Sequence, residues 1–246
     1  MRKIVKTLII TALIAVISLC GYELWKISDQ YAQEARIREA MSKYYTEAAA
    51  VPDKEKALPT SDAKVNQWLI DMQNEVNRDI VGWLFVPETL INYPFVQAAD
   101  NNFYLRRDLH GENAIAGSLF MDYRCSKDFA DFNTIIYGHN MKNNGMFGDL
   151  SLFADEGFFE SHPGGTVHLS DNSISLEFFA CMIVSSNDVV IYNPSSDRDV
   201  YFEYVRENAL NYRKPESWGN VVTLSTCSYE FSDARIVLLA YPSPTL

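Results

Sequence analysis

The chain has 246 residues and a mass of 28.0 kDa, and its 48% hydrophobic content is ample for a buried core. Its formal net charge of −11 and its pI near 4.8 produce a field that repels phosphates, which argues against nucleic acid as a partner. The four cysteines include no C-x-x-C pair and the acidic residues show no D-x-D-x-D-G spacing, so we expect no disulfide scaffold, no metal and no other cofactor.

The N-terminal segment has the composition of a membrane anchor. Residues 7–22 carry no charge. The apolar stretch from Ile4 to Trp25 is long enough, at about 20 residues, to cross a hydrocarbon core of ~30 Å if Lys6 snorkels. Positive charge is concentrated before this stretch, which predicts that the N-terminus lies inside the cell and the rest of the chain outside the cytoplasm. We therefore expect residues 1–26 to form a single transmembrane anchor.

Two other interpretations of this segment stay open. A cleaved signal peptide requires small residues in an A-x-A-like pattern after the apolar region, and the nearest small residues lie inside it. A lipoprotein would use Cys20 as its acylated residue, but Leu19 stands where a small residue is expected. An uncleaved anchor, with Cys20 as an inert thiol in the membrane, is the better account.

Residues 27–59 are predicted to be a helical stalk and linker. Residues 28–50 contain good helix formers but few apolar side chains, which favours a solvated helix. Residues 51–59 are polar, with a proline towards each end, and are typical of a linker. Apolar residues at helical spacing then predict a second helix over residues 60–76.

After Asn77 the chain changes to short apolar runs that glycine, proline, asparagine or aspartate separates. The runs are residues 81–86, 91–97, 117–124, 133–140, 165–170, 173–184, 220–227 and 235–241. Such runs with no regular helix between them are typical of an all-β barrel or sandwich. Two helical interruptions are predicted, at 147–153 and 199–211. The predicted fold class is therefore mainly β with flanking helices.

Three residues with complementary chemistry lie at the ends of predicted strands. Cys227 ends one strand, Arg235 begins the next, and His139 follows the glycine at the end of a third. Cysteine acyl transfer needs a thiolate nucleophile, an acid/base and a group that binds the developing oxyanion. Only ~3% of a free thiol is ionised at pH 7, so local tuning or proton transfer to His139 must supply the thiolate. The spacing of these three residues does not by itself exclude a purely structural role for each of them.

Longer motifs add a family resemblance. Residues 223–227 (Thr-Leu-Ser-Thr-Cys) followed by Arg235, with Tyr-Gly-His at 137–139, resemble the active-site signature of sortases, the membrane-anchored cysteine transpeptidases of Gram-positive bacteria. Further blocks look like class B members: residues 77–84, 93–97, 101–105, 117–124 and 144–147. The resemblance covers the chain from about residue 60 to the C-terminus.

The resemblance implies a fold and a domain organisation. The expected fold is a sortase-like closed β-barrel of about eight strands, with N-terminal helices and an extra helix before the strand that bears Cys227. Residues 199–211 would be the extra helix. Residues 60–246 would be the catalytic domain, held on the extracellular face of the cytoplasmic membrane by the N-terminal anchor.

The resemblance also implies a reaction. Cys227 would attack the threonine carbonyl of a C-terminal sorting signal similar to Asn-Pro-x-Thr followed by Asn or Gly, forming a thioacyl-enzyme. His139 would protonate the leaving amine and later deprotonate the incoming one, while Arg235 would hold the carbonyl oxygen. The implied partners are surface proteins that carry such a signal and a peptidoglycan precursor amine.

By motif position, six residues resemble the substrate-groove residues of the family. They are Asn101, Leu105, Tyr137, Ser225, Ile191 and Tyr192. Ser228 stands where some relatives carry an acidic residue. Cys181 is expected in the core, and Cys125 is expected to be a bystander in a loop.

Two rival functions use the same residues. A cysteine peptidase would release its acyl-enzyme to water, and a non-catalytic membrane-tethered binding module would need Cys227 only for structure.

Overall fold

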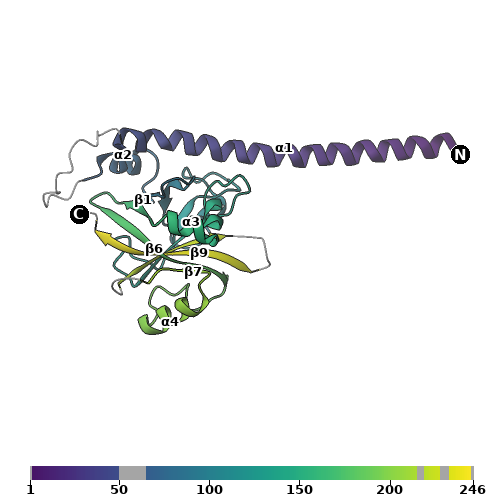
Figure 1. The fold of residues 1–246 in the computed structure, drawn as a ribbon. Coiled ribbons are helices and arrows are strands. Elements are labelled where there is room, and N and C mark those ends of the chain that lie inside the picture. Colours follow the sequence, from purple (N-terminus) through teal and green to yellow (C-terminus); the bar gives the residue numbers. More distant parts are fainter. Residues whose placement is uncertain (1, 50–64, 215–218, 228–232, 245–246) are drawn as a thin grey trace.

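A ring of β-strands forms the centre of the computed structural model, which describes residues 2–49, 65–214, 219–227 and 233–244 (Figure 1). The strands in chain order are β1 (Ile80–Phe85), β2 (Asn92–Val96), β3 (Leu119–Met121), β4 (Asn133–His139), β5 (Gly164–His168), β6 (Ser173–Ser185), β7 (Asn211–Tyr212), β8 (Val221–Cys227) and β9 (Ala234–Pro244). Each predicted apolar run contains one strand of the ring. The short β7 was not predicted, because two residues show no alternation.

The strand order closes the ring. Neighbouring strands follow the order β5-β1-β2-β3-β4-β8-β9-β6, β5 also pairs with β6, and β7 is added at the side of β6. The β2–β3 and β4–β8 pairs are parallel, whereas the other pairs in the ring are antiparallel. The prediction of a closed barrel of about eight strands is confirmed.

Successive side chains of the strands enter different hydrophobic clusters. Along β9, Leu238 and Ala240 belong to one cluster, whereas Val237 and Leu239 belong to another. The reason is that alternate residues of a strand point to opposite faces of a sheet. One cluster therefore lies on the inner face of the barrel and the other on its outer face.

Helices cover the outer clusters. Helix α4 (Arg198–Asn208) contributes Tyr201, Phe202 and Val205 to the cluster on β6, β8 and β9. Helix α2 (Gln67–Glu75) contributes Leu69 and Met72 to a further cluster with residues of β1 and β2. The predicted extra helix before the strand of Cys227 is thus present as α4, and the predicted second helix is present as α2.

Two short helical segments lie between β4 and β5. The 3-10 helix η2 (Gly148–Ala154) occupies the predicted interruption at 147–153, and α3 (Glu156–Ser161) follows it. Helix α3 was not predicted. Asp155 caps it by accepting a hydrogen bond of 2.9 Å from the Phe158 amide.

Helix α1 (Arg2–Ala49) joins the predicted anchor and the predicted stalk in one continuous element. It contains an exposed apolar segment long enough to cross a membrane, within Lys3–Ile37. Its C-terminal part lies beside α2 above the barrel in Figure 1, where Glu34 is buried and Ile37 packs against the cluster under α2. The predicted linker at 51–59 lies outside the described residues.

Candidate active site

The carboxyl ends of β4 and β8 meet at one edge of the barrel. The register of these parallel strands runs from Asn133 opposite Val221 to His139 opposite Cys227. Both strands end at this last pair, so the backbones of His139 and Cys227 are direct neighbours. The backbone of Cys227 is described but its side chain is not, and Ser228 lies outside the described residues.

Arg235 reaches the same edge from β9. Strands β8 and β9 are antiparallel, and Ser225 pairs with Val237. Beyond this pair, the Ile236 amide donates a hydrogen bond of 3.2 Å to Thr226 Oγ1, which holds the strands together up to the residue before the thiol. Arg235 is half-buried and lines a cavity. The three predicted catalytic residues thus come from three adjacent strands.

The imidazole of His139 is held by the backbone of a neighbouring segment. His139 is 7% exposed, and its Nε2 lies 2.9 Å from the carbonyl oxygen of Leu105. Because a carbonyl oxygen only accepts, Nε2 carries the proton of this hydrogen bond, and Nδ1 is the basic nitrogen of the neutral ring. Leu105 therefore orients the histidine through its backbone, and it also lines the cavity.

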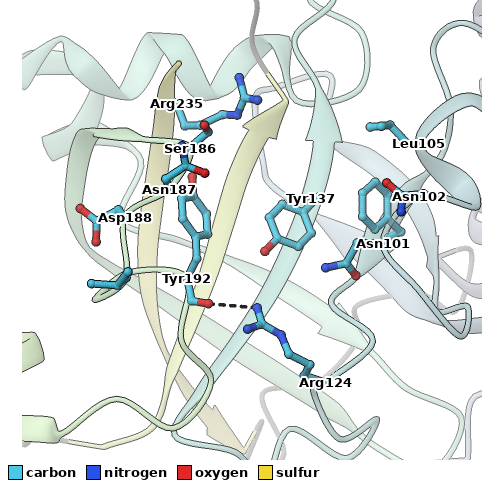
Figure 2. Close-up of a pocket in the computed structure, with 12 residues that line it drawn as sticks. Asn101, Asn102, Leu105, Arg124, Tyr137, Ser186, Asn187, Asp188, Tyr192 and Arg235 are labelled. Atoms are coloured by element: carbon cyan, nitrogen blue, oxygen red, sulfur yellow. Dashed lines mark hydrogen bonds between the residues drawn. The ribbon is translucent and has the colours of Figure 1, made fainter. Parts of the chain in front are cut away.

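A cavity of about 580 Å³ opens beside these strand ends. Its size is in the range that suits a small ligand or a few residues of a peptide. Among the described residues, those that line it are Asn101, Asn102, Leu105, Phe120, Arg124, Tyr137, Ser186, Asn187, Asp188, Val189, Tyr192 and Arg235. Figure 2 shows two walls that face each other: residues 101–105 with Tyr137 on one side, and residues 186–192 with Arg235 on the other.

The first wall is organised by the buried carboxylate of Asp122. Its oxygens accept hydrogen bonds from Asn101 Nδ2 at 3.0 Å, from Tyr137 Oη at 3.0 Å, and from Arg124 Nε and Nη2 at 2.8 and 2.7 Å. Burial raises the pKa of Asp122, but the hydrogen bonds from Arg124 and Asn101 outweigh burial and hold that pKa below its ordinary value. Asp122 is therefore a charged acceptor at neutral pH.

Tyr137 is the matching donor in this cluster. Burial, followed by the negative charge of Asp122, raises the pKa of Tyr137 well above its ordinary value. The hydroxyl therefore keeps its proton and donates a hydrogen bond to Asp122 rather than acting as a base.

Arg124 and Tyr137 join the two walls through Tyr192. Arg124 Nη2 donates a hydrogen bond of 2.9 Å to the Tyr192 carbonyl, which is the dashed line in Figure 2. The rings of Tyr137 and Tyr192 are stacked with centroids 6.0 Å apart. The Tyr192 hydroxyl lies 2.9 Å from Ser225 Oγ. These contacts set the width of the cavity.

The predicted groove residues fall into two groups. Asn101, Leu105, Tyr137 and Tyr192 line the cavity. Ser225 is fully buried behind it and reaches it through the Tyr192 hydroxyl. The side chain of Ile191 is fully buried in the cluster under α4, and its carbonyl accepts a hydrogen bond of 2.7 Å from Asn133 Nδ2.

The sequence interpretation did not assign roles to Asp122, Arg124 or residues 186–189. Asp122 and Arg124 belong to the block at 117–124 that carried the family resemblance. The one sequence feature that could have identified them is a pair of opposite charges directly after an apolar run. Residues 186–189 form an irregular segment after β6, and no local pattern predicts that they approach the cavity.

Two other cysteines are unsuited to nucleophilic chemistry. Cys125 and Cys181 are 5% and 0% exposed. Burial raises the pKa of Cys125 to about 11 and that of Cys181 to about 12. Both thiols are therefore protonated at neutral pH, and the prediction that Cys181 is a core residue is confirmed.

No protein-family model matches the chain. Over 199 residues it is 35% identical to sortase B of Listeria monocytogenes, an alignment that covers 78% of this chain and 80% of that protein. The chain belongs to the sortase B family. This sortase is a cysteine transpeptidase, as the motifs at residues 137–139 and 223–227 predicted.

Solved structures agree with this assignment. Sortase B of Bacillus anthracis, in complex with AAEK2, is 33% identical with a TM-score of 0.71, and the match covers 85% of this sortase and 96% of that chain. A Staphylococcus aureus sortase B–substrate complex shares the fold at a TM-score of 0.69 and 24% identity, over 87% of this sortase and 94% of that chain.

Proposed function

We propose that Cys227 of this sortase cleaves a C-terminal sorting signal after threonine and passes the upstream protein to a cell-wall amine. The Cys227 thiolate attacks the threonine carbonyl carbon, and Arg235 stabilises the oxyanion. His139 gives a proton to the leaving amine as the peptide C–N bond breaks, which leaves a thioester on Cys227. An incoming amine then loses a proton to His139, forms the new amide and releases the thiolate.

The pairing of His139 with Cys227 at the ends of β4 and β8 is the observation that carries this proposal. A sheet edge is rigid, and catalytic groups need to be held within about 0.5 Å of a productive geometry. Arg235 comes from the next strand and lines the adjoining cavity, where an oxyanion donor contributes about 10²–10³-fold in rate. The hydrogen bond from His139 Nε2 to the Leu105 carbonyl leaves Nδ1 as the proton acceptor.

The proposed signal resembles Asn-Pro-x-Thr followed by Asn or Gly. A related sortase B from S. aureus has been solved with a substrate, which supports a sorting signal as the substrate class here. Asn101, Leu105, Tyr137 and Tyr192 are the proposed contact residues, because they line the cavity. Ser225 would act through the Tyr192 hydroxyl that it contacts.

Ile191 would act from the core behind the groove wall, where its carbonyl binds the side chain of Asn133. The proposed acceptor is the amine of a peptidoglycan precursor, which would be available at the extracellular location proposed below.

The proposed location is the outer face of the cytoplasmic membrane. Residues 1–26 would be the anchor, residues 27–59 the helical stalk and linker, and residues 60–246 the catalytic domain. The exposed apolar segment of α1, which is long enough to cross a membrane, supports an anchor. The lysines and arginine before it support an N-terminus inside the cell.

Mass spectrometry of the full chain in lipid nanodiscs tests this function. The enzyme is incubated with Asn-Pro-x-Thr-Asn, Asn-Pro-x-Thr-Gly and Leu-Pro-x-Thr-Gly peptides, with and without oligoglycine or a diaminopimelate-containing amine. We expect cleavage after threonine, a thioacyl adduct on Cys227, and a transpeptidation product when the amine is present. The adduct is lost in Cys227→Ala and retained in the matched control Cys20→Ala.

The other outcomes contradict the proposal in different ways. Hydrolysis at the same rate with and without every amine would indicate a cysteine peptidase. Peptide binding without an adduct, in a folded protein with a free Cys227 thiol, would indicate a binding module.

A further inference from the structure

Glu34 of α1 is a buried acidic residue with specific partners on the barrel. Only 2% of Glu34 is exposed. Its Oε1 accepts a hydrogen bond of 2.6 Å from the Tyr93 hydroxyl, and its Oε2 lies 3.4 Å from Asn143 Nδ2. Burying a carboxylate is costly unless hydrogen bonds compensate for the lost water. The contact therefore ties α1 to the barrel at Glu34.

Tyr93 extends this contact to the backbone of a turn. The Tyr93 hydroxyl donates to Glu34 and accepts a hydrogen bond of 3.1 Å from the Met146 amide. Met146 has a φ of 54°, a left-handed conformation that a methionine rarely adopts, and Asn144 has a φ of 63°. The hydrogen bond from Met146 to Tyr93 is well placed to hold this unfavourable backbone.

The turn also closes directly on the carboxylate. A Cβ atom on Gly145 would lie 2.9 Å from the Cδ and Oε2 atoms of Glu34. A side chain at this position would therefore push the Glu34 carboxylate out of its place. The turn and α1 are therefore in close packing contact as well as linked by hydrogen bonds.

This turn is the immediate continuation of His139. Asn140 and Met146 form a β-bridge, and the Phe147 amide donates a hydrogen bond of 2.9 Å to the His139 carbonyl. The backbone that leaves His139 is thus held by a turn that donates a hydrogen bond to Tyr93 and packs against Glu34. Helix α1 also carries the apolar segment predicted to cross the membrane.

We infer that Glu34 is a positioning residue for the transpeptidation reaction: through Tyr93 it holds the 140–147 turn, and the turn holds the end of β4 that carries His139. The inference rests on the acid/base role proposed for His139. It makes full activity depend on the docking of the membrane-proximal part of α1 against the barrel. A change in that docking alters proton transfer at His139 without changing any residue of the groove.

The test uses the full chain in nanodiscs with Glu34→Ala, Glu34→Gln, Tyr93→Phe and the double variant Glu34→Ala/Tyr93→Phe. The burst of leaving peptide in the absence of amine counts the competent sites. We expect kcat per competent site to fall roughly tenfold in Glu34→Ala and in Tyr93→Phe, because small displacements of a catalytic group have large effects on rate. The KM should change less than about twofold, since none of the variants replaces a residue that lines the cavity.

Three further results are expected. The double variant is no slower than either single variant, because both remove the same link. Glu34→Gln recovers most of the activity, since its amide oxygen still accepts from Tyr93. The pH profile of kcat/KM shifts in Glu34→Ala and Tyr93→Phe. Glu39→Ala, which removes an exposed carboxylate from the same helix, leaves kcat and the profile unchanged.

A purely structural role would overturn the inference. In that case the variants would lower the melting temperature or the number of competent sites, while kcat per site and the pH profile stayed at wild-type values. His139→Ala separates this failure from that of the proposed function. If His139→Ala keeps its turnover, the proposed catalytic role fails; if it is inactive while Glu34→Ala and Tyr93→Phe are normal per site, only the inference on Glu34 fails.

Discussion

The two walls of the cavity are built in different ways. The wall at residues 101–105 and Tyr137 is tied to the buried charge of Asp122 by several hydrogen bonds. The wall at residues 186–192 is an irregular segment in which Asp188 accepts hydrogen bonds from the backbone amides of Val190 and Ile191. Its Val189 is 82% exposed.

This difference matches what each wall has to do. The first wall includes the segment that orients His139 through the Leu105 carbonyl, and the acid/base role proposed for His139 needs a fixed position. The second wall can shift with less cost, because its carboxylate acceptor Asp188 is only partly buried, whereas Asp122 is fully buried, and local opening is easiest where burial is low. We therefore expect changes in the first wall to affect stability and changes in the second to affect substrate binding.

Replacing the buried charge should have the largest effect. In Asp122→Asn the new amide NH₂ faces donors from Arg124, Tyr137 and Asn101, so hydrogen bonds are lost and donors are left unpaired. We expect the free energy of unfolding at pH 7 to fall by about 2–3 kcal/mol, measured by urea denaturation. Asp171→Asn, at an exposed position, should change it by less than about 0.5 kcal/mol. An equal effect of both variants would contradict the role of Asp122.

The same variant gives a pH dependence with a definite sign. Because the folded-state pKa of Asp122 is lowered, its charge contributes stability that is fully present above the unfolded pKa of about 3.9. This contribution is lost as the pH falls through the folded-state pKa. The stability difference between wild type and Asp122→Asn should therefore be constant from pH 7 to about pH 5 and shrink below about pH 4. Urea midpoints measured across this range check it, and a difference that grows on acidification would reverse the assignment.

A substitution at the junction of the two walls should have an intermediate effect. Arg124→Lys keeps the charge beside Asp122 but cannot bind both carboxylate oxygens and the Tyr192 carbonyl at once. We expect the KM for the sorting-signal peptide to rise roughly three- to tenfold with kcat nearly unchanged, because the width of the groove is less well fixed. Arg206→Lys, on α4, is the matched control. A fall in kcat with an unchanged KM would indicate that Arg124 takes part in the chemistry instead.

The smallest effect is expected within the second wall. Tyr192→Phe removes the hydrogen bond to Ser225 but keeps the ring stacked on Tyr137. Unfolding free energy should fall by less than about 1 kcal/mol, and the KM should rise about twofold. Ser225→Ala should raise the KM by the same factor as Tyr192→Phe. The double variant should raise the KM no further than either single variant. Additive effects in the double variant would show that the two hydroxyls act separately.

Most of the barrel follows from local patterns along the chain. Runs such as 133–140 and 235–241 alternate or are continuously apolar, and each became a strand. The helix before the strand of Cys227 has good helix formers and begins after Asp197, which accepts a hydrogen bond from the Val200 amide. Helix α3 was missed because its six residues are too few for a periodic pattern.

The predicted site was less complete than the predicted barrel, because part of it depends on burial. Cys227, His139 and Arg235 stand in short motifs that can be found along the sequence. Asp122 and Arg124 have no distinguishing feature in the sequence. Only the folded barrel places Asn101 and Tyr137 within hydrogen-bond distance of Asp122. Their roles depend on burial, and a charged residue in a sequence carries no local sign that it will be buried.

The local sequence pattern alone is sufficient to predict the strands, the apolar N-terminal segment and the family motif at residues 223–227. The folded barrel was needed for the register of His139 with Cys227, the cavity between two walls, and the contact of Glu34 with Tyr93 across 59 positions of sequence. The physical reason is that the periodicity of side chains is a property of neighbouring residues. Hydrogen bonds between residues distant in sequence form only when folding brings the two partners together, and burial then strengthens them.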